Sequence, residues 1–174
     1  MWLEIEQDVN IPVAGFFVDP EMLDIFEYEL EYGNPKTALV EPYSVVLTHR
    51  AAKKLFKQEN PVGESFKVGD EGPYKVTGIL KETNHKSHIV FDALASISTV
   101  KSLEALDKRK KGGIDDWYNA WQGWIYIVLE KDKTIDDILA HLAKIEKQYF
   151  TKVPNPDTDN KIHYKPQALM SITP

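Results

Sequence analysis

The sequence predicts an α+β fold with two lobes, and three observations lead to this prediction. Short strand and helix patterns follow one another before residue 83, longer alternating elements follow residue 88, and the polar segment TNHKSH lies between them. The prediction places residues 15–82 in a small first lobe, which is inserted into a second lobe, residues 83–174, with a β-α-β-α-β order. Residues 1–14 are expected to form a strand of the second lobe, so the two termini should lie close together.

The first expected element is an extended strand in WLEIEQDVNIPVAGFFV, where apolar and polar residues alternate loosely and Pro12 and Gly15 bend the chain. A short helix should follow, because Asp19 can cap it and Pro20 already has the backbone angle of a first helical turn. Its apolar stripe comprises Met22, Leu23 and Phe26. The GNP sequence at residues 33–35 ends this helix.

A strand followed by a helix is predicted next. The strand is Val45–Leu47, and Thr48 caps a helix in HRAAKKLF. The inward-facing residues of this helix are Ala52, Leu55 and Phe56. The sequence NPVG at residues 60–63 has the composition of a type I turn, and it leads into a hairpin of Ser65–Val68 and Tyr74–Leu80.

The second lobe is predicted to contain three strands and two helices. In chain order they are a strand Ile89–Ala95, a helix Thr99–Lys111, a strand Trp124–Glu130, a helix Ile135–Tyr149 and a strand Tyr164–Ile172. The helix from Ile135 has the clearest signals, because Thr134 and Asp137 have capping-box spacing and lysines occur near its end.

Composition limits the classes of protein that remain possible. The chain has 174 residues, of which 43% are hydrophobic and 28% are charged, so it can bury a core of its own. Its formal net charge of −6 argues against a nucleic-acid partner, which would need a basic face. Cysteine is absent, and the apolar stretches are shorter than the roughly 20 residues that cross a bilayer. The first residues do not resemble a secretory signal.

Sequence motifs for catalysis are not found. The chain lacks a GxxxxGK[ST] phosphate loop, a GxSxG elbow, an HExxH helix and a GxGxxG turn. Any catalytic arrangement would therefore have to be assembled from carboxylates, serines and the five histidines in three dimensions. We predict no enzymatic activity and no cofactor.

Two groups of polar residues have the spacing of metal ligands. His85 and His88 could both reach one zinc or nickel ion, and Asp157 and Asp159 resemble part of a calcium loop. We favour solvated loops for both, because the histidine pair supplies only two local ligands and the aspartates lack the central glycine and closing glutamate of a calcium loop. The sequence therefore predicts no metal site.

An aromatic group and a basic group each allow two interpretations. Trp117, Trp121 and Trp124 would align on a helix as a stacking platform for a sugar or an aromatic ligand, although burial against a sheet is the more common outcome. The run Lys108 to Lys111 would end the helix predicted at residues 99–111. A solvated helix end is favoured there over an anion site.

Several strings occur in an order and spacing that is informative when they are taken together. They are VDPEMLDIFEYELEYGNPKTAL, SVVLTHRAAKKLF, NPVGESFKV, YKVTGILKE and KSHIVFD, with WIYIVLE and YKPQALMSI further on. This succession, over about residues 17–172, resembles the periplasmic domain of MacB/FtsX-type ABC-transporter permeases. The sequence departs from that family because the flanking transmembrane helices and most of the strand–helix–strand segment before VDP are absent.

The resemblance implies a domain without an active site, tethered to the cytoplasmic membrane and facing the periplasm or the extracellular side. An ATP-binding cassette subunit or domain would act on it through transmembrane helices, and a second permease copy or an adaptor protein would be its partner. The first lobe would be membrane-distal and the second membrane-proximal. Partner contacts are therefore expected at the acidic residues Glu21, Asp24 and Glu27 of the first lobe.

The alternative is a free-standing extracytoplasmic module that binds a sugar or a peptide through the tryptophans. That module would need exposed indole rings. A hydrolase, in contrast, would need carboxylates or a Ser–His pair that converge in a pocket.

Overall fold

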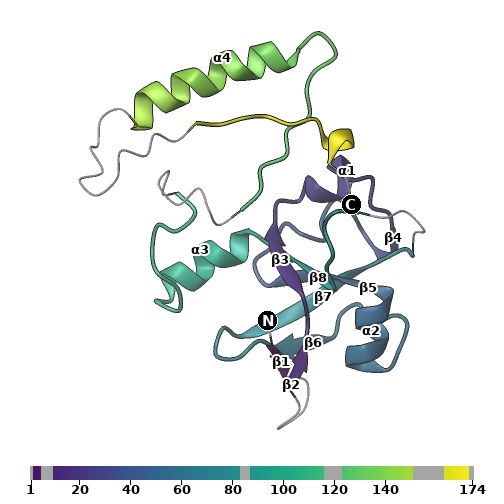
Figure 1. Ribbon diagram of the computed structural model, residues 1–174. Helices are drawn as coiled ribbons and strands as arrows, with labels where there is room; N and C mark the ends of the chain where they lie inside the picture. The colour runs from purple at the N-terminus through teal and green to yellow at the C-terminus, as the bar shows by residue number, and fades with distance from the viewer. Residues whose placement is uncertain (1, 5–9, 83–86, 116–122, 151–162, 173–174) are drawn as a thin grey trace. The chain divides into compact units, whose positions relative to one another are not determined.

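The computed structural model describes residues 2–4, 10–82, 87–115, 123–150 and 163–172. The chain divides into two compact units, residues 1–116 and residues 117–174 (Figure 1). Among the described residues, no helix is long and apolar enough to span a membrane.

The first unit is built on a mixed sheet, to which eight strands of the described residues contribute (Figure 1). The strands are β1 (Trp2–Glu4), β2 (Asn10–Pro12), β3 (Gly15–Val18), β4 (Leu30–Gly33), β5 (Ser44–Thr48), β6 (Ser65–Lys67), β7 (Pro73–Leu80) and β8 (Ala93–Ser96). Their order is β2-β1-β6-β7-β5-β8-β3, and β4 pairs with β7 beside this path. The β3–β8 and β5–β7 pairs are parallel, and the other pairs are antiparallel. The predicted α+β class is confirmed.

Strand β5 occupies the centre of the sheet. It pairs with both β7 and β8, and Ser44, Val45, Val46 and Leu47 are all buried. A strand covered on both faces has a continuous apolar run, which is the pattern that predicted it. The hairpin predicted after the NPVG turn is also present, because Phe66 pairs antiparallel with Tyr74 in the β6–β7 ladder.

Three helices of the described residues accompany this sheet. They are α1 (Met22–Ile25), α2 (His49–Phe56) and α3 (Ser98–Ala105). The Ala51 backbone N–H donates to Thr48 Oγ1 at 3.1 Å, so the predicted cap of α2 is confirmed. The predicted Asp19 cap of the first helix is wrong, because α1 starts after Glu21 and its N-cap makes no side-chain hydrogen bond.

The hydrophobic core of the first unit lies between the sheet and α2. Its central aromatic side chain is Tyr74, which is 1% exposed, stacks on Phe66 at 6.1 Å and meets Tyr43 edge-on at 5.5 Å. Ala52 and Leu55 are buried against the sheet as the helical spacing predicts, whereas Phe56 is only half-buried at the edge of this core.

The second unit contains α4 (Ile135–Ile145), the π-helix η1 (Glu146–Phe150) and the short 3₁₀ helix η2 (Leu169–Ser171). The capping box of Thr134 and Asp137 is present, so the predicted helix start is confirmed. Glu146 Oε1 accepts the Tyr164 backbone N–H at 2.7 Å, and this bond lowers the pKa of Glu146. The bond ties the end of the helix to the segment that starts at residue 163.

The two strands predicted in the second unit are not formed. Residues 124–130 carry no strand assignment, and residues 163–168 lead directly into η2. Ile125 is 83% exposed and Val128 is 70% exposed. Their apolar pattern suits a strand, but a strand also requires a ladder with a second strand, and neither segment forms one among the described residues.

The first compact unit includes a strand that the sequence analysis assigned to the second lobe. β8 lies between β5 and β3, so residues 87–115 belong with the preceding strands in this unit. β1 and β2 pair with each other, and β1 also pairs with β6. The lobes expected at residues 1–14, 15–82 and 83–174 remain a prediction for the complete protein.

Candidate functional site

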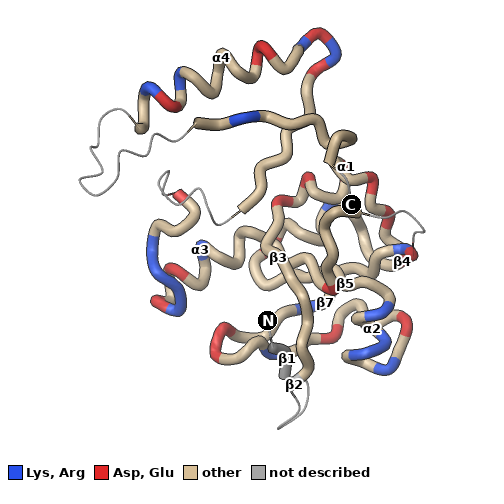
Figure 2. The backbone as a smooth tube through the Cα atoms, in the orientation of Figure 1, with Lys and Arg blue, Asp and Glu red and all other residues tan. Residues whose placement is uncertain are grey.

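The segment from Asp19 to Glu31 concentrates negative charge on the first unit. It contains six acidic residues and no basic residue. All six are exposed, and Figure 2 shows their red positions along α1 and the chain that leads into β4. We call residues 19–31 the acidic segment. Its charge favours basic partners and repels anions.

The three predicted contact residues surround the single turn of α1. Glu21 immediately precedes the turn, Asp24 lies within it, and Glu27 follows it with a positive φ of 54°. Met22 and Leu23 are 8% and 2% exposed, so the turn is anchored in the interior by its apolar residues. The structure therefore presents all three carboxylates to solvent on a short, anchored support.

Four ring side chains form a partly exposed aromatic cluster beside this turn. Phe26 stacks on Tyr28 with ring centroids 5.8 Å apart, and Tyr28 meets Phe91 edge-on at 5.6 Å. His88 lies 6.1 Å from Phe26, and all four rings are half-buried. The helical spacing predicted Phe26 in the core stripe of the helix, but its ring lies in this cluster instead. The cluster was missed because Phe91 is more than sixty residues from Phe26 along the chain.

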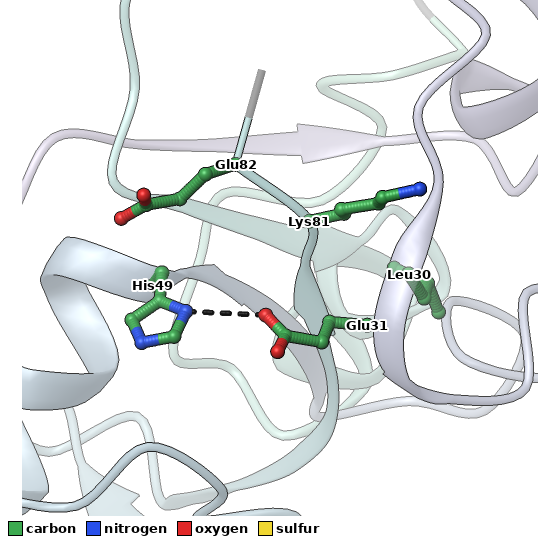
Figure 3. Close-up of a pocket in the computed structure, with 5 residues that line it drawn as sticks. All are labelled: Leu30, Glu31, His49, Lys81 and Glu82. Carbon is green, nitrogen blue, oxygen red and sulfur yellow. Dashed lines mark hydrogen bonds and ion pairs between the residues drawn. The ribbon is translucent and has the colours of Figure 1, made fainter.

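A shallow pocket of about 460 Å³ opens between β4, α2 and the end of β7. Leu30, Glu31, His49, Lys81 and Glu82 line it (Figure 3). His49 Nδ1 lies 3.2 Å from Glu31 Oε2, an arrangement in which the ring N–H donates to the carboxylate. His49 Nε2 is buried and has no hydrogen-bond partner among the described residues.

This pocket lacks the arrangement expected of a general base. The other ring nitrogen of a catalytic histidine must reach substrate, whereas the Nε2 atom of His49 is shielded from solvent. At its rim Lys81 Nζ donates to Glu29 Oε2 at 2.6 Å, which lowers the pKa of Glu29 and raises that of Lys81. Both partners are exposed, so this pair neutralises charge without creating a buried reactive group.

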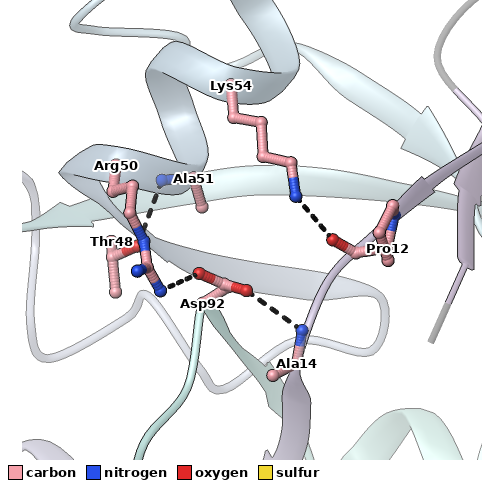
Figure 4. A network of polar contacts seen from close by, with 7 residues as sticks. All are labelled: Pro12, Ala14, Thr48, Arg50, Ala51, Lys54 and Asp92. Carbon is pink, nitrogen blue, oxygen red and sulfur yellow. Dashed lines mark hydrogen bonds and ion pairs between the residues drawn. The ribbon is translucent and has the colours of Figure 1, made fainter.

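A polar network around Asp92 fixes the chain next to Phe91. Asp92 Oδ1 accepts from Arg50 at 2.7 Å, and Oδ2 accepts the Ala14 backbone N–H at 3.1 Å (Figure 4). The Asp92 backbone N–H donates to the Ala14 carbonyl at 2.7 Å. Each of the two segments therefore donates a backbone hydrogen bond to the other. Lys54 also donates to the Pro12 carbonyl at 2.8 Å. The network joins α2 to the starts of the parallel strands β3 and β8, and thereby holds Phe91 in place.

The basic run after α3 is held against the first unit. Lys108 Nζ donates to the backbone carbonyls of Asp70 and Glu71, and the Arg109 guanidinium lies 4.9 Å from the centre of the Phe17 ring. The four basic residues are exposed as predicted, but the prediction that they end the helix is wrong. α3 ends at Ala105, and the basic residues follow in a segment that contacts the β6–β7 connection.

The remaining sequence candidates do not form a site in the described part of the chain. No group of three or more potential metal ligands occurs there. Trp124 is 67% exposed. The candidates that lie outside the described residues are His85, Trp117, Trp121, Asp157 and Asp159.

Comparisons with known proteins identify one family and two structures of similar fold. Residues 4–145 match the family model described as MacB-like periplasmic core domain. A solved domain described as part of a permease protein from Porphyromonas gingivalis is similar at 16% identity, with a TM-score of 0.61 and 85% of this chain covered. The periplasmic region of MacB from Actinobacillus actinomycetemcomitans is similar at 16% identity, with a TM-score of 0.55 and 86% of this chain covered.

The likeness to these two structures establishes a shared fold. The aligned part of this chain corresponds to 59% of the first solved domain and 63% of the second. No curated protein sequence matches the chain significantly.

Proposed function

Since the chain belongs to the family of MacB-like periplasmic core domains, we propose that it serves as the extracytoplasmic domain of an ABC-transporter permease. The family match over residues 4–145 is the observation that carries this proposal. In the complete protein, the domain is tethered to the cytoplasmic membrane and faces the periplasm or the extracellular side. The tether, the membrane side and the transport role are all parts of the proposal, because the solved relatives extend well beyond this chain.

The proposed role is mechanical and not catalytic. A cassette subunit or domain uses ATP in the cytoplasm, transmembrane helices carry the movement, and the extracytoplasmic domain moves a substrate or a partner. Stiffness supports this role, because β5 is buried between two neighbouring strands and the Asp92 network ties α2 to β3 and β8. The shielded Nε2 atom of His49 argues against His49 as a general base in the pocket that it lines.

The proposed contact for a second permease copy or an adaptor protein is the membrane-distal lobe, residues 15–82. Glu21, Asp24 and Glu27 are exposed there on an anchored turn. Charges at the edge of an interface accelerate encounter and orient the partners, and their mutation changes the association rate most. Charge reversal at these positions in the full-length transporter should impair complex formation while leaving the domain folded.

Site-directed labelling tests the proposed location, and residues 1–174 contribute no native cysteine that would have to be replaced first. A single cysteine replaces Glu64, an exposed residue outside the acidic segment, in the membrane-bound full-length protein. A membrane-impermeant maleimide should label this cysteine in intact cells with a permeabilised outer envelope. Lys36→Cys, also exposed, serves as a second reporter. Labelling of both sites only after lysis of the cytoplasmic membrane would refute the location.

A free-standing ligand-binding module is the second candidate, and the 67% exposure of Trp124 favours it. Such a module should bind maltohexaose or short peptides, and the indole fluorescence should change on binding. A Trp124→Ala variant should then lose the fluorescence change and the affinity together. Titrations without saturable binding would eliminate this candidate for the ligands tested.

A further inference from the structure

We propose that the acidic segment and the aromatic cluster together form a docking surface for a basic protein partner other than a second copy of this chain. The inference rests on the proposed function, because it specifies which kind of protein the extracytoplasmic domain meets. The surface comprises the carboxylates of residues 19–31, the rings of Phe26, Tyr28, His88 and Phe91, and the exposed side chain of Val90.

The apolar centre of this surface has the composition of an interface core. Aromatic residues are enriched at the energetically important positions of protein interfaces, where they fill well-packed and desolvated sites. Tyr28 and Phe91 pack edge-on and remain half-buried, so part of each ring is still in contact with water. Val90 is 74% exposed, whereas its neighbour Ile89 is 7% exposed, so the backbone directs one apolar residue inward and the next outward.

The rim around this centre is predominantly negative. Within the described residues, Glu21, Asp24 and Glu27 have no ion-pair partner. Lys81 is paired with Glu29 and so offsets a single carboxylate of the six. A partner with basic residues around an apolar side chain would complement both the rim and the centre.

The chain itself is a poor source of that basic partner. Its longest basic run is already held by the first unit, since Lys108 binds carbonyls of the β6–β7 connection and Arg109 covers Phe17. Lys111 pairs with Asp107 at 2.8 Å. The net charge of −6 also makes two copies repel each other. These observations favour a different protein with a basic and apolar face.

The surface is organised before a partner arrives. The left-handed backbone of Glu27 allows the chain to turn between α1 and Tyr28, and the Asp92 network fixes the segment that carries Phe91. A preorganised surface loses less conformational freedom on binding, so more of the interaction energy contributes to affinity.

Three labelled peptides test the inference against the intact chain by fluorescence anisotropy. The first is a fourteen-residue helical peptide with leucine on one face and arginine on the other, the second replaces every arginine by glutamate, and the third replaces every leucine by serine. We expect saturable binding of the arginine–leucine peptide, binding at least about tenfold weaker for the arginine–serine peptide, and none for the glutamate–leucine peptide. Equal binding of the first and third peptides, or no saturable binding of the first, would refute the proposal.

Two sets of charge reversals locate the binding surface. The E21K/D24K/E27K variant should bind the arginine–leucine peptide at least about tenfold more weakly, whereas the control E59K/E64K/D70K should stay within about twofold of the parent. The control residues are exposed and lie near β6. Thermal unfolding of both variants verifies that they are folded. Equal losses in the two sets would mean that net charge alone attracts the peptide, and would overturn the site.

The aromatic centre and the exclusion of self-association need their own measurements. Val90→Ser should weaken binding without unfolding the domain, because Val90 is 74% exposed and the change removes apolar contact area without adding charge. Sedimentation equilibrium should give a monomer for the parent chain and for the E21K/D24K/E27K variant. A dimer that the triple reversal dissociates would overturn the choice of partner. Failure of the maleimide labelling would refute the proposed extracytoplasmic location without affecting the peptide results. Failure of peptide binding would refute the docking surface without affecting the location. The two failures are therefore distinguishable.

Discussion

Replacement of Gly33 by alanine should destabilise the first unit much more than replacement of Gly63. Both glycines have a positive φ, 101° and 99°, so an alanine at either position adopts a backbone conformation that costs about 1–2 kcal/mol. The surroundings differ, because a Cβ atom on Gly63 meets nothing within 4 Å. A Cβ atom on Gly33 would lie 2.4 Å from the Thr77 carbonyl oxygen and 2.8 Å from the Gly78 Cα.

The added cost at Gly33 is set by what would have to move. Thr77 and Gly78 belong to β7, which pairs with β4, β5 and β6, so their backbone atoms cannot shift without disturbing several ladders. Overlap of this kind costs roughly 1–3 kcal/mol beyond the backbone strain. Alanine also reduces the conformational entropy of the unfolded chain, which stabilises both variants by about 0.4–1 kcal/mol. We therefore expect a net loss of about 3 kcal/mol for Gly33→Ala and about 1 kcal/mol for Gly63→Ala.

Urea denaturation followed by circular dichroism measures this difference directly. The slope of the unfolding free energy against urea should be similar in both variants, so the shift in midpoint reports stability. Binding of the arginine–leucine peptide gives a second readout, because β4 follows the acidic segment and should lose its fixed position in Gly33→Ala. Free energies of unfolding that agree within about 0.5 kcal/mol between the two variants would refute the close approach of β4 to β7.

Three further predictions follow from hydrogen bonds and burial. Asp92→Ala should lower the free energy of unfolding by about 2 kcal/mol and Arg50→Ala by about 0.5 kcal/mol, because only the first change also removes the bond to the Ala14 backbone N–H just before β3. Equal losses in urea denaturation would contradict this. The backbone N–H and the hydroxyl of Thr134 donate to Asp137 and lower the pKa of its carboxyl group in the folded state. The ionised carboxylate therefore stabilises the start of α4 at pH values above the pKa of Asp137 in the unfolded chain. This stabilisation is lost as the pH falls through the lower pKa of the folded state. Helicity between pH 6 and pH 2 should therefore fall less in Asp137→Asn, and identical profiles would refute the capping role. Burial raises the pKa of Tyr74 far above its usual range, so its hydroxyl should stay protonated near pH 11. The absorbance change at 295 nm, which reports tyrosine ionisation, should therefore be the same in Tyr74→Phe as in the parent. A smaller change in the variant would show that Tyr74 ionises.

Local signals in the sequence predicted the parts of the fold that depend on neighbouring residues. Thr48 and Thr134 cap helices as their spacing predicts, and the apolar run at β5 marks the most enclosed strand. Capping and turn formation involve residues a few positions apart, so the sequence displays them directly. The position of β8 between β5 and β3 depends on contacts across more than forty residues, and no local pattern encodes that neighbour.

The candidate surface was predictable only in part for the same reason. Glu21, Asp24 and Glu27 are visible in the sequence as a charged stretch, and their exposure follows from the buried residues beside them. The rings that give the surface an apolar centre come from two distant segments. They meet because the parallel pairing of β3 with β8 and the bonds of Asp92 bring residues 87–92 to this edge of the unit.

Segment 124–130 has the sequence pattern of a strand but does not form one in the structure. Its residues WIYIVLE have high strand propensity, yet Ile125 and Val128 are largely exposed and no ladder is assigned there. Strand propensity mostly measures how well side chains pack against neighbours on a sheet, so it does not by itself produce a strand where the described residues form no ladder. Helix α4 forms under the same conditions, although Ile135 and Leu139 are 45% and 42% exposed, because a helix satisfies its backbone within its own segment. The helix predicted at residue 135 was therefore found, whereas the strands predicted on either side of it were not.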